Sequence, residues 1–304
     1  MAGESLASDA HANDARAAAE DGVVADEPVA ADDRLVADGG ARAGLVLGGM
    51  ALRDGVLLQS DGHWAAAVRL PDGTLRVRSG PRKHVPGSRA LSRVPVARGV
   101  VRLGEAVSVL PTLRREMGLP VLPQEDPRLL AAAAGSTAAT LLLRSSRRGS
   151  PLLRELGVAA LTLGPALLAI RDSELSRMHG AEHKSVSAYE AGTDSGEASK
   201  EHARCGSNLI GPLLVTSTIG SVVLARLGKD KSPLAVLAAG LVSIGSAVEL
   251  FAWMARHQGH PVADLLRTPG LQVQKLFTTR EPSPDQLGVA QAALAELLRL
   301  EGVA

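Results

Sequence analysis

The run CGSNLIGPLLVTSTIGSVVLA occupies residues 205–225, and over these 21 residues the only ionisable side chain is the thiol of Cys205. A second run, SPLAVLAAGLVSIGSAVELFAWMA, occupies residues 232–255, where Glu249 is the one ionisable group. Both exceed the ~18 residues expected of a membrane-spanning helix. Two shorter uncharged runs precede them, at residues 129–143 and 156–170. We therefore expect a mainly α, multi-span helical membrane protein, although Ala-rich helices buried in a soluble protein could have the same composition.

The chain before these runs divides into two expected segments. Residues 1–42 are acidic and lack a periodic apolar face, so we expect a disordered tail. Residues 43–127 should form a small β-rich module, followed by a helix and a Pro-rich linker. Its strongest signal is a hairpin, because β-type runs at residues 64–70 and 74–78 flank Pro71-Asp72-Gly73. The helix is predicted over residues 99–115, where apolar residues recur with a helical period.

The runs and the segment after them complete the expected organisation. Residues 128–256 should be a helical membrane domain that contains a polar loop at residues 171–208. Residues 257–304 should carry an amphipathic helix, which we expect to pack on its own domain. Its start is marked by Ser283 as the N-cap, Pro284 at the first helical position and Gln286 at the third.

Composition excludes several functions. Aromatic residues make up only 2% of the chain, which argues against nucleic-acid binding by stacking on aromatic side chains. The single cysteine rules out an internal disulfide and a CxxC zinc module. We expect the lipid bilayer to be a partner and nucleic acid not to be one.

The polar loop contains the pattern most suggestive of chemistry, His179-Gly180-Ala181-Glu182-His183. Residues three and four apart share one face of a helix, so the two imidazoles and the carboxylate should be neighbours. Two imidazoles one turn apart can hold one metal ion, and the carboxylate can act as a base or complete the coordination shell. The alternative is a solvated pair of histidines at the membrane interface.

Other polar residues could join this group. Glu190 follows on the same helical face, and His202 and Cys205 have the spacing of a second pair of ligands. Glu249 interrupts an apolar run, where an ionisable group suggests function, although it could instead be a packed carboxylate with an Arg partner. If the last three apolar runs each cross a bilayer, all these groups come to one side. Tyr189 could orient the site or anchor at the interface.

Several segments resemble the YqhQ-like family of bacterial membrane proteins. They are LGGMALRDGVLLQ at 47–59, ARGVVRLGEAVSV at 97–109, HGAEHKSVSAYEAG at 179–192, HARCGSN at 202–208 and PGLQVQKLFTTREPSPDQLGVAQAAL at 269–294. The resemblance implies a multi-pass membrane protein and a predicted metal-dependent enzyme. It places the family's polar signature on His179, Glu182, His183, Tyr189, Glu190, His202, Cys205 and Glu249. Met50, Asp54, Ala203 and Ser207 depart from the family's usual residues.

These observations predict a divalent metal, with zinc favoured by imidazole and thiolate ligands from His179, His183, His202 and Cys205. The expected chemistry is hydrolysis, with Glu182 or Glu190 as the catalytic base. Two other classes stay open: a non-catalytic membrane protein with a closed structural metal site, and a transporter that uses Glu249. Basic residues in the larger polar segments favour a cytoplasmic position for these segments in a cell-membrane protein, whereas Arg144, Arg147 and Arg148 in the first short loop argue for the opposite orientation. Substrate and oligomeric state do not follow from the sequence.

Overall fold

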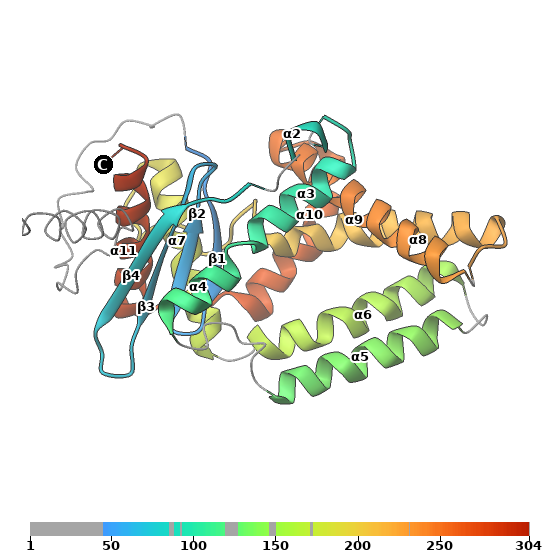
Figure 1. Cartoon of the computed structure of the whole chain (residues 1–304), viewed down its shortest axis with the longest axis horizontal. Helices are drawn as coiled ribbons and strands as arrows, with labels where there is room; N and C mark the ends of the chain where they lie inside the picture. The colour runs from blue at the N-terminus through green and yellow to red at the C-terminus, as the bar shows by residue number, and fades with distance from the viewer. Residues whose placement is uncertain are drawn as a thin grey trace, which may run out of the picture.

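The computed structural model describes residues 45–84, 88–91, 93–118, 127–145, 150–170, 173–230 and 232–303. The predicted acidic tail at residues 1–42 lies outside these ranges, as do linker residues 119–126. Figure 1 shows a part built around a β-sheet and, extending from it, a part made of long helices. The predicted mainly helical fold with a small β-rich segment is confirmed.

The sheet is a four-stranded antiparallel meander in which each strand pairs with the next along the chain. Its strands are β1 (Gly48–Leu52), β2 (Gly55–Gln59), β3 (His63–Arg69) and β4 (Leu75–Pro81). The turn between β3 and β4 is the predicted one: Gly73 adopts a φ of 86°, which glycine tolerates without strain. The carboxylate of Asp72 accepts a 2.9 Å hydrogen bond from the backbone N–H of Thr74 and so closes the turn.

Helices cover both faces of the sheet. Because side chains alternate along a strand, β2 and β3 present apolar residues to both sides. One face packs on α7 (Ser173–Ala191) and α11 (Pro284–Leu300), through Val56, Leu58, Ala65 and Ala67. The other packs on α4 (Leu110–Met117), through Leu57, Trp64, Ala66 and Val68. The segments predicted as a separate β-rich module and a C-terminal helix thus share one core, which α7 completes.

Helix α11 begins as the sequence predicts. Ser283 caps it by accepting a hydrogen bond from the backbone N–H of Gln286, and the Gln286 side chain accepts one from the backbone N–H of Ser283. This capping box satisfies two otherwise unpaired donors at the helix start. The helix packs on the sheet and on α7, which confirms the expectation that it packs on its own domain.

The predicted helix over residues 99–115 is interrupted. It forms α3 (Ala97–Val107) and α4, with the short α2 (Ser88–Leu91) before them. The hydroxyl of Ser108 donates to the carbonyl of Glu105, and Pro111 then occupies the first turn of α4, where its missing N–H is tolerated. The break lets α4 cover the sheet while α3 packs on α9.

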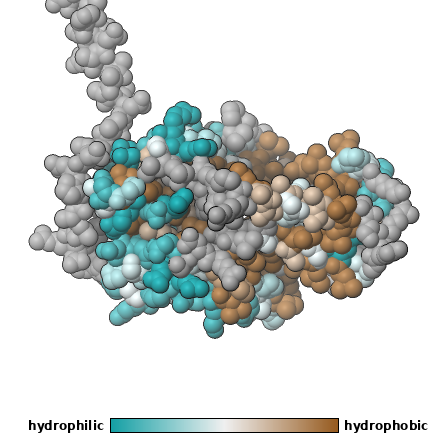
Figure 2. Space-filling view, turned by 90° about the horizontal axis from the view of Figure 1, so that it is seen from below, coloured by the Kyte–Doolittle hydropathy of each residue, from teal (hydrophilic) through white to brown (hydrophobic). Residues whose placement is uncertain are grey.

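Two helical hairpins form the second part. One joins α5 (Pro127–Ser145) to α6 (Pro151–Ile170), and the other joins α8 (Ile210–Arg226) to α9 (Pro233–Arg256). Figure 1 shows both hairpins pointing away from the sheet in the same direction. In Figure 2 the surface of this part is largely hydrophobic, whereas the part that holds the sheet is largely hydrophilic.

Within the described part of the chain, two helical stretches are long and apolar enough to cross a membrane by length and composition: Gly206–Arg226 and Pro233–Arg256. They coincide with the two long apolar runs of the sequence. The apolar stretch Leu130–Leu143 in α5 is shorter. In α6 the carboxyl group of Glu155 is buried and accepts a 2.6 Å hydrogen bond from the hydroxyl of Ser221 in α8, which ties the two hairpins together.

The chain returns to the sheet through α10 (Pro261–Val273) and a π-helical turn, η4 (Gln274–Thr278). A short 3₁₀ turn, η3 (Gly206–Leu209), precedes α8. Both turns lie where the two parts of the molecule meet, and π-helical turns of this kind often occur at functional sites. They supply backbone and side-chain groups to the residues described next.

Candidate metal centre

Helix α7 brings His179, Glu182 and His183 onto one face, as their spacing predicts. The centroids of the two imidazole rings lie 4.3 Å apart. Helix α7 can pass close to η4 and the residues after it because Gly180 has no Cβ. A Cβ at this position would overlap the backbone carbonyl of Arg280. That close approach brings the carbonyl of Thr278 next to His179.

Hydrogen bonds fix the orientation of both imidazoles. Nδ1 of His179 lies 2.9 Å from the carbonyl oxygen of Thr278, and Nδ1 of His183 lies 2.6 Å from that of Lys200. A carbonyl oxygen can only accept, so Nδ1 donates in each case and Nε2 carries the free lone pair. Metal-binding histidines are commonly held in this way, with the second ring nitrogen bonded to a carbonyl or carboxylate.

Cys205 completes a group of three potential ligands. Its sulfur lies 3.5 Å from Nε2 of His179, and the ligand atoms of His179, His183 and Cys205 all lie within 4.8 Å of one another. The hydroxyl of Ser207 donates to the same sulfur. Two imidazole nitrogens and a sulfur are a donor set that suits zinc, so the residues present fit the predicted metal.

Glu182 lies at the edge of this group. Its carboxylate is 3.6 Å from Nε2 of His183, and only 5% of the residue is exposed. Burial raises the pKa of this carboxyl group above its ordinary value. Burial also lowers the pKa of His183, which favours the neutral imidazole, the form that binds metal.

His202 lies next to the group but outside it. Its ring centroid is 5.8 Å from that of His183. Both ring nitrogens have other partners: Nε2 is 3.1 Å from the carboxylate of Glu190, and Nδ1 accepts from the backbone N–H of Arg204. Glu190 is also paired with the guanidinium of Arg204. The predicted ligand His202 and the predicted base Glu190 therefore bind each other.

The two remaining candidates lie away from this group. Tyr189 packs against the core between the sheet and its helices. Glu249, in α9, accepts two hydrogen bonds from the guanidinium of Arg98 in α3. Glu249 thus has an Arg partner, which was one of the two alternatives open from the sequence. The polar groups were expected to meet on one side of the membrane, but Glu249 does not join the candidate ligands.

Gln274 and Thr278 of η4 belong to the site, although the sequence analysis assigned them no role. Gln274 is fully buried, accepts from the backbone N–H of His202 and donates to the hydroxyl of Ser207, so it holds the Cys205 loop in place. The sequence signal for both residues was the segment 269–294, which resembles the family's closing segment but contains no histidine or cysteine.

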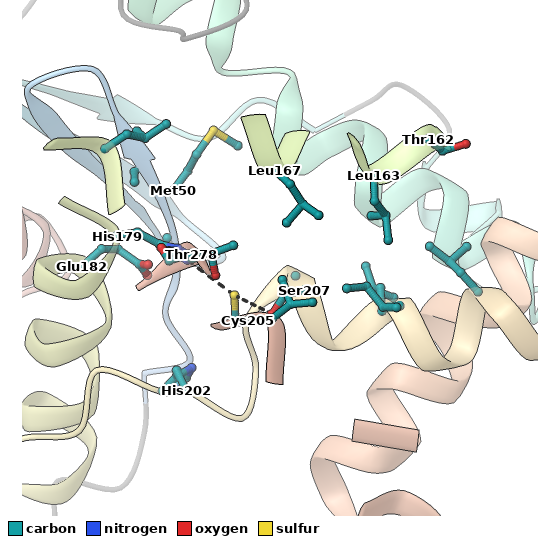
Figure 3. A pocket seen from close by; sticks show the side chains of 18 of the residues that line it. Met50, Thr162, Leu163, Leu167, His179, Glu182, His202, Cys205, Ser207 and Thr278 are labelled. Atoms are coloured by element: carbon teal, nitrogen blue, oxygen red, sulfur yellow. Dashed lines mark hydrogen bonds between the residues drawn. The ribbon is translucent and has the colours of Figure 1, made fainter. Parts of the chain in front are cut away.

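A cavity of about 1030 Å³ adjoins the candidate ligands. Figure 3 shows His179, Glu182, Cys205 and Thr278 at one end of it and Leu163 and Leu167 of α6 farther along its wall. Strand β1 contributes to the polar end, where Gly49 passes so close to the Glu182 carboxylate that a Cβ would overlap it. The opening motif of the sequence therefore forms part of the same site.

Comparisons with known proteins agree with the resemblance seen in the sequence. Residues 169–300 match the family described as "Protein of unknown function (DUF1385)". The chain is 28% identical to "Uncharacterized protein YqhQ" of Bacillus subtilis (strain 168) over 302 residues, which covers 84% of this chain and 93% of the relative. No solved structure matches. The matched region contains all three candidate ligands, Glu182 and η4.

Proposed function

We propose that this YqhQ-like protein is a metal-dependent hydrolase of the membrane, with a zinc ion held by His179, His183 and Cys205. The observation that carries the proposal is the meeting of three ligand atoms within 4.8 Å, with both imidazoles fixed by bonds from Nδ1 to backbone carbonyls. Three protein ligands are typical of catalytic zinc, because a fourth position is then left for water or substrate.

When bound, such an ion supplies a Lewis acid that polarises the scissile bond and acidifies water. Glu182 would act as the base, taking a proton from the attacking water and passing it to the leaving group. Burial raises the pKa of Glu182, which makes its carboxylate a stronger base for the first of these transfers. Burial of the carboxylate also keeps it beside His183 and away from bulk solvent.

The two rival functions have less support. A closed structural site needs a fourth ligand, but His202 uses both ring nitrogens for other partners, and Glu182 does not belong to the group of described residues whose ligand atoms all lie within 4.8 Å of one another. A transporter that uses Glu249 needs a carboxylate free to take up an ion or proton, whereas Glu249 is paired with Arg98.

We further propose that both hairpins, α5–α6 and α8–α9, cross the bilayer and that the part holding the sheet lies in the cytoplasm. Support comes from the common direction of the hairpins and from the hydrophobic surface of that part (Figures 1 and 2). Reporters fused at Gly44 and at Ala304 should fall on the same side of the membrane. Reporters on opposite sides would refute four spans.

The catalytic proposal is tested by Glu182→Gln, with Glu190→Gln as the matched control. The protein is purified in detergent and assayed for zinc content and for hydrolysis of a panel of carboxyl-ester and phosphoester substrates. We expect Glu182→Gln to keep its zinc but to lose about 10²–10⁴-fold in rate, because it removes the base. Glu190→Gln should keep both. If Glu182→Gln retains the wild-type rate, or the wild type hydrolyses nothing in the panel, the proposal is wrong.

A further inference from the structure

The cavity beside the candidate ligands runs far into the helical part. Its wall includes Leu130 and Leu141 of α5, Leu163 of α6, Leu213 of α8 and Val236 of α9. Leu130 and Leu141 are eleven residues apart, which corresponds to about 16 Å along a helix axis. Half of the ~30 Å hydrocarbon core of a bilayer is of similar depth. The cavity thus extends along the hairpins over about one membrane leaflet.

The two ends of the cavity differ in chemistry. Towards the hairpin tips the wall combines aliphatic side chains with the hydroxyl side chains of Ser136, Thr137, Thr140 and Thr162, and no charged residue lines it in the described part of the chain. At the other end lie the candidate ligands, Glu182 and Thr278. Thr278 is 3% exposed, and its hydroxyl oxygen has no hydrogen-bond partner among the described residues. A buried hydroxyl without a hydrogen-bond partner destabilises the folded state, so a polar group that entered from the cavity and bonded to this hydroxyl would be stabilised here.

We infer that the cavity binds a lipid-like amphiphile, with its apolar chain between the hairpins and its polar head at His179, His183 and Cys205. This inference rests on the proposed function, for which it names the substrate class: a membrane lipid with an ester or phosphoester bond near its head. The hydroxyl of Thr278 bonds the head, and the aliphatic wall holds the chain.

The width of the occupant favours a lipid chain over a helical membrane peptide, because a helix with its side chains is about 10–12 Å wide. An acyl chain is much thinner than a helix and needs no separation of α5 from α9. The polar head can then reach Glu182 without unfolding of the substrate.

Binding can be measured separately from hydrolysis. The probe is a palmitoyl lysophospholipid added to the full chain in detergent, and its binding is followed by native mass spectrometry with and without a chelator. Ala133→Trp places a large side chain in the cavity, because Ala133 lines it. Ala138→Trp is the matched control, since Ala138 is exposed on the same helix and is not among the residues that line the cavity.

We expect one probe molecule per chain, about tenfold weaker binding in Ala133→Trp, and binding within about twofold of wild type in Ala138→Trp. Removal of the metal by the chelator should leave most of the affinity intact, because the palmitoyl chain of the probe supplies it. Three results would each overturn the inference. They are an equal loss of probe affinity in both tryptophan variants, no probe binding by the wild type, and displacement of the probe by a helical membrane peptide at a concentration below that of the probe. If the probe binds specifically but is not hydrolysed, the inference is supported and the proposed function is refuted. If the protein hydrolyses short water-soluble esters but does not bind the probe, the proposed function is supported and the inference is refuted.

Discussion

At the scale of single residues, Gly49 constrains the side chain of Glu182 directly. A Cβ at this position would overlap the carboxylate of Glu182, whereas a Cβ at the neighbouring Gly48 would meet nothing within 4 Å. The two glycines therefore form a matched pair on one strand. Replacing either glycine by alanine adds one methyl group to β1. At Gly49 this methyl group would overlap Glu182, whereas at Gly48 it would contact nothing.

We predict that Gly49→Ala lowers the free energy of unfolding by about 1–3 kcal/mol, the usual cost of overpacking. It should also move Glu182 and lower any hydrolytic rate, while zinc content stays at the wild-type level. Gly48→Ala should leave stability and zinc unchanged. Thermal unfolding and metal analysis of the detergent-purified variants measure both effects, and equal melting temperatures for the two variants would contradict the account.

Residue spacing could predict part of the site. His179, Glu182 and His183 share a helix, and neighbours on a helix face are fixed by local geometry. The roles of His202, Glu190 and Glu249 could not be read in the same way, because their partners Arg204 and Arg98 reach them through loops and through helix packing. Gln274 and Thr278 were missed because they act through an amide and a backbone carbonyl, which leave no recognisable pattern in a sequence.

At the scale of elements, the contact between α6 and α8 depends on a polar pair. The hydroxyl of Ser221 donates to the buried carboxyl group of Glu155 at 2.6 Å. Ser221→Ala should destabilise the protein in detergent by about 1 kcal/mol, as is typical of hydrogen bonds between helices in membrane proteins. Ser217→Ala, one turn earlier on α8, is the control. A melting temperature of Ser221→Ala at or above that of the control would show that this pair does not join the hairpins.

The attachment of α11 to the sheet should depend on pH. Hydrogen bonds from Arg299 and from the hydroxyl of Ser79 in β4 hold the pKa of Glu296 below its ordinary value of 4.5. The folded chain thus binds this proton less readily than the unfolded chain, so the stabilisation is complete above pH 4.5 and is lost as pH falls through the lowered pKa.

Glu296→Gln should therefore lose less stability than the wild type on acidification, although it starts from a slightly lower value, within about 1 kcal/mol. Melting temperatures measured from neutral pH down to about pH 3, which covers the range below the ordinary pKa of a glutamate, test this. Arg69→Gln, which removes a contact with the backbone of α11 but no carboxylate, should follow the wild-type slope. Parallel curves for Glu296→Gln and the wild type would be the contrary result.

The elements themselves were largely predictable. The β3–β4 hairpin and the start of α11 follow from turn and cap residues that act within a few positions. The break between α3 and α4 was not predicted, because apolar residues continue to recur with a helical period across Ser108. This pattern gave no indication that a new helix, with Pro111 in its first turn, begins at Leu110. The sequence also did not predict that these elements share one core, since 113 residues lie between β2 and α7 and 92 residues lie between α7 and α11.

At the scale of the whole molecule, the candidate ligands lie where the sheet-containing part meets the two hairpins. Cys205 stands just before η3 and α8, whereas His179 and His183 come from α7, which belongs to the core around the sheet. A metal ion bound by all three would join the two parts. The same position opens the site to the cavity beside the hairpins, which would give the lipid-like substrate inferred above a route to the candidate ligands (Figure 3).

Metal analysis of the full chain purified in detergent tests the central claim most directly. The account predicts about one zinc per wild-type chain, a large loss in His183→Ala and a content close to wild type in His202→Ala, because His202 lies outside the ligand group. Equal zinc in the wild type and His183→Ala, or loss of zinc only in His202→Ala, would contradict the assignment of His179, His183 and Cys205 as the metal ligands.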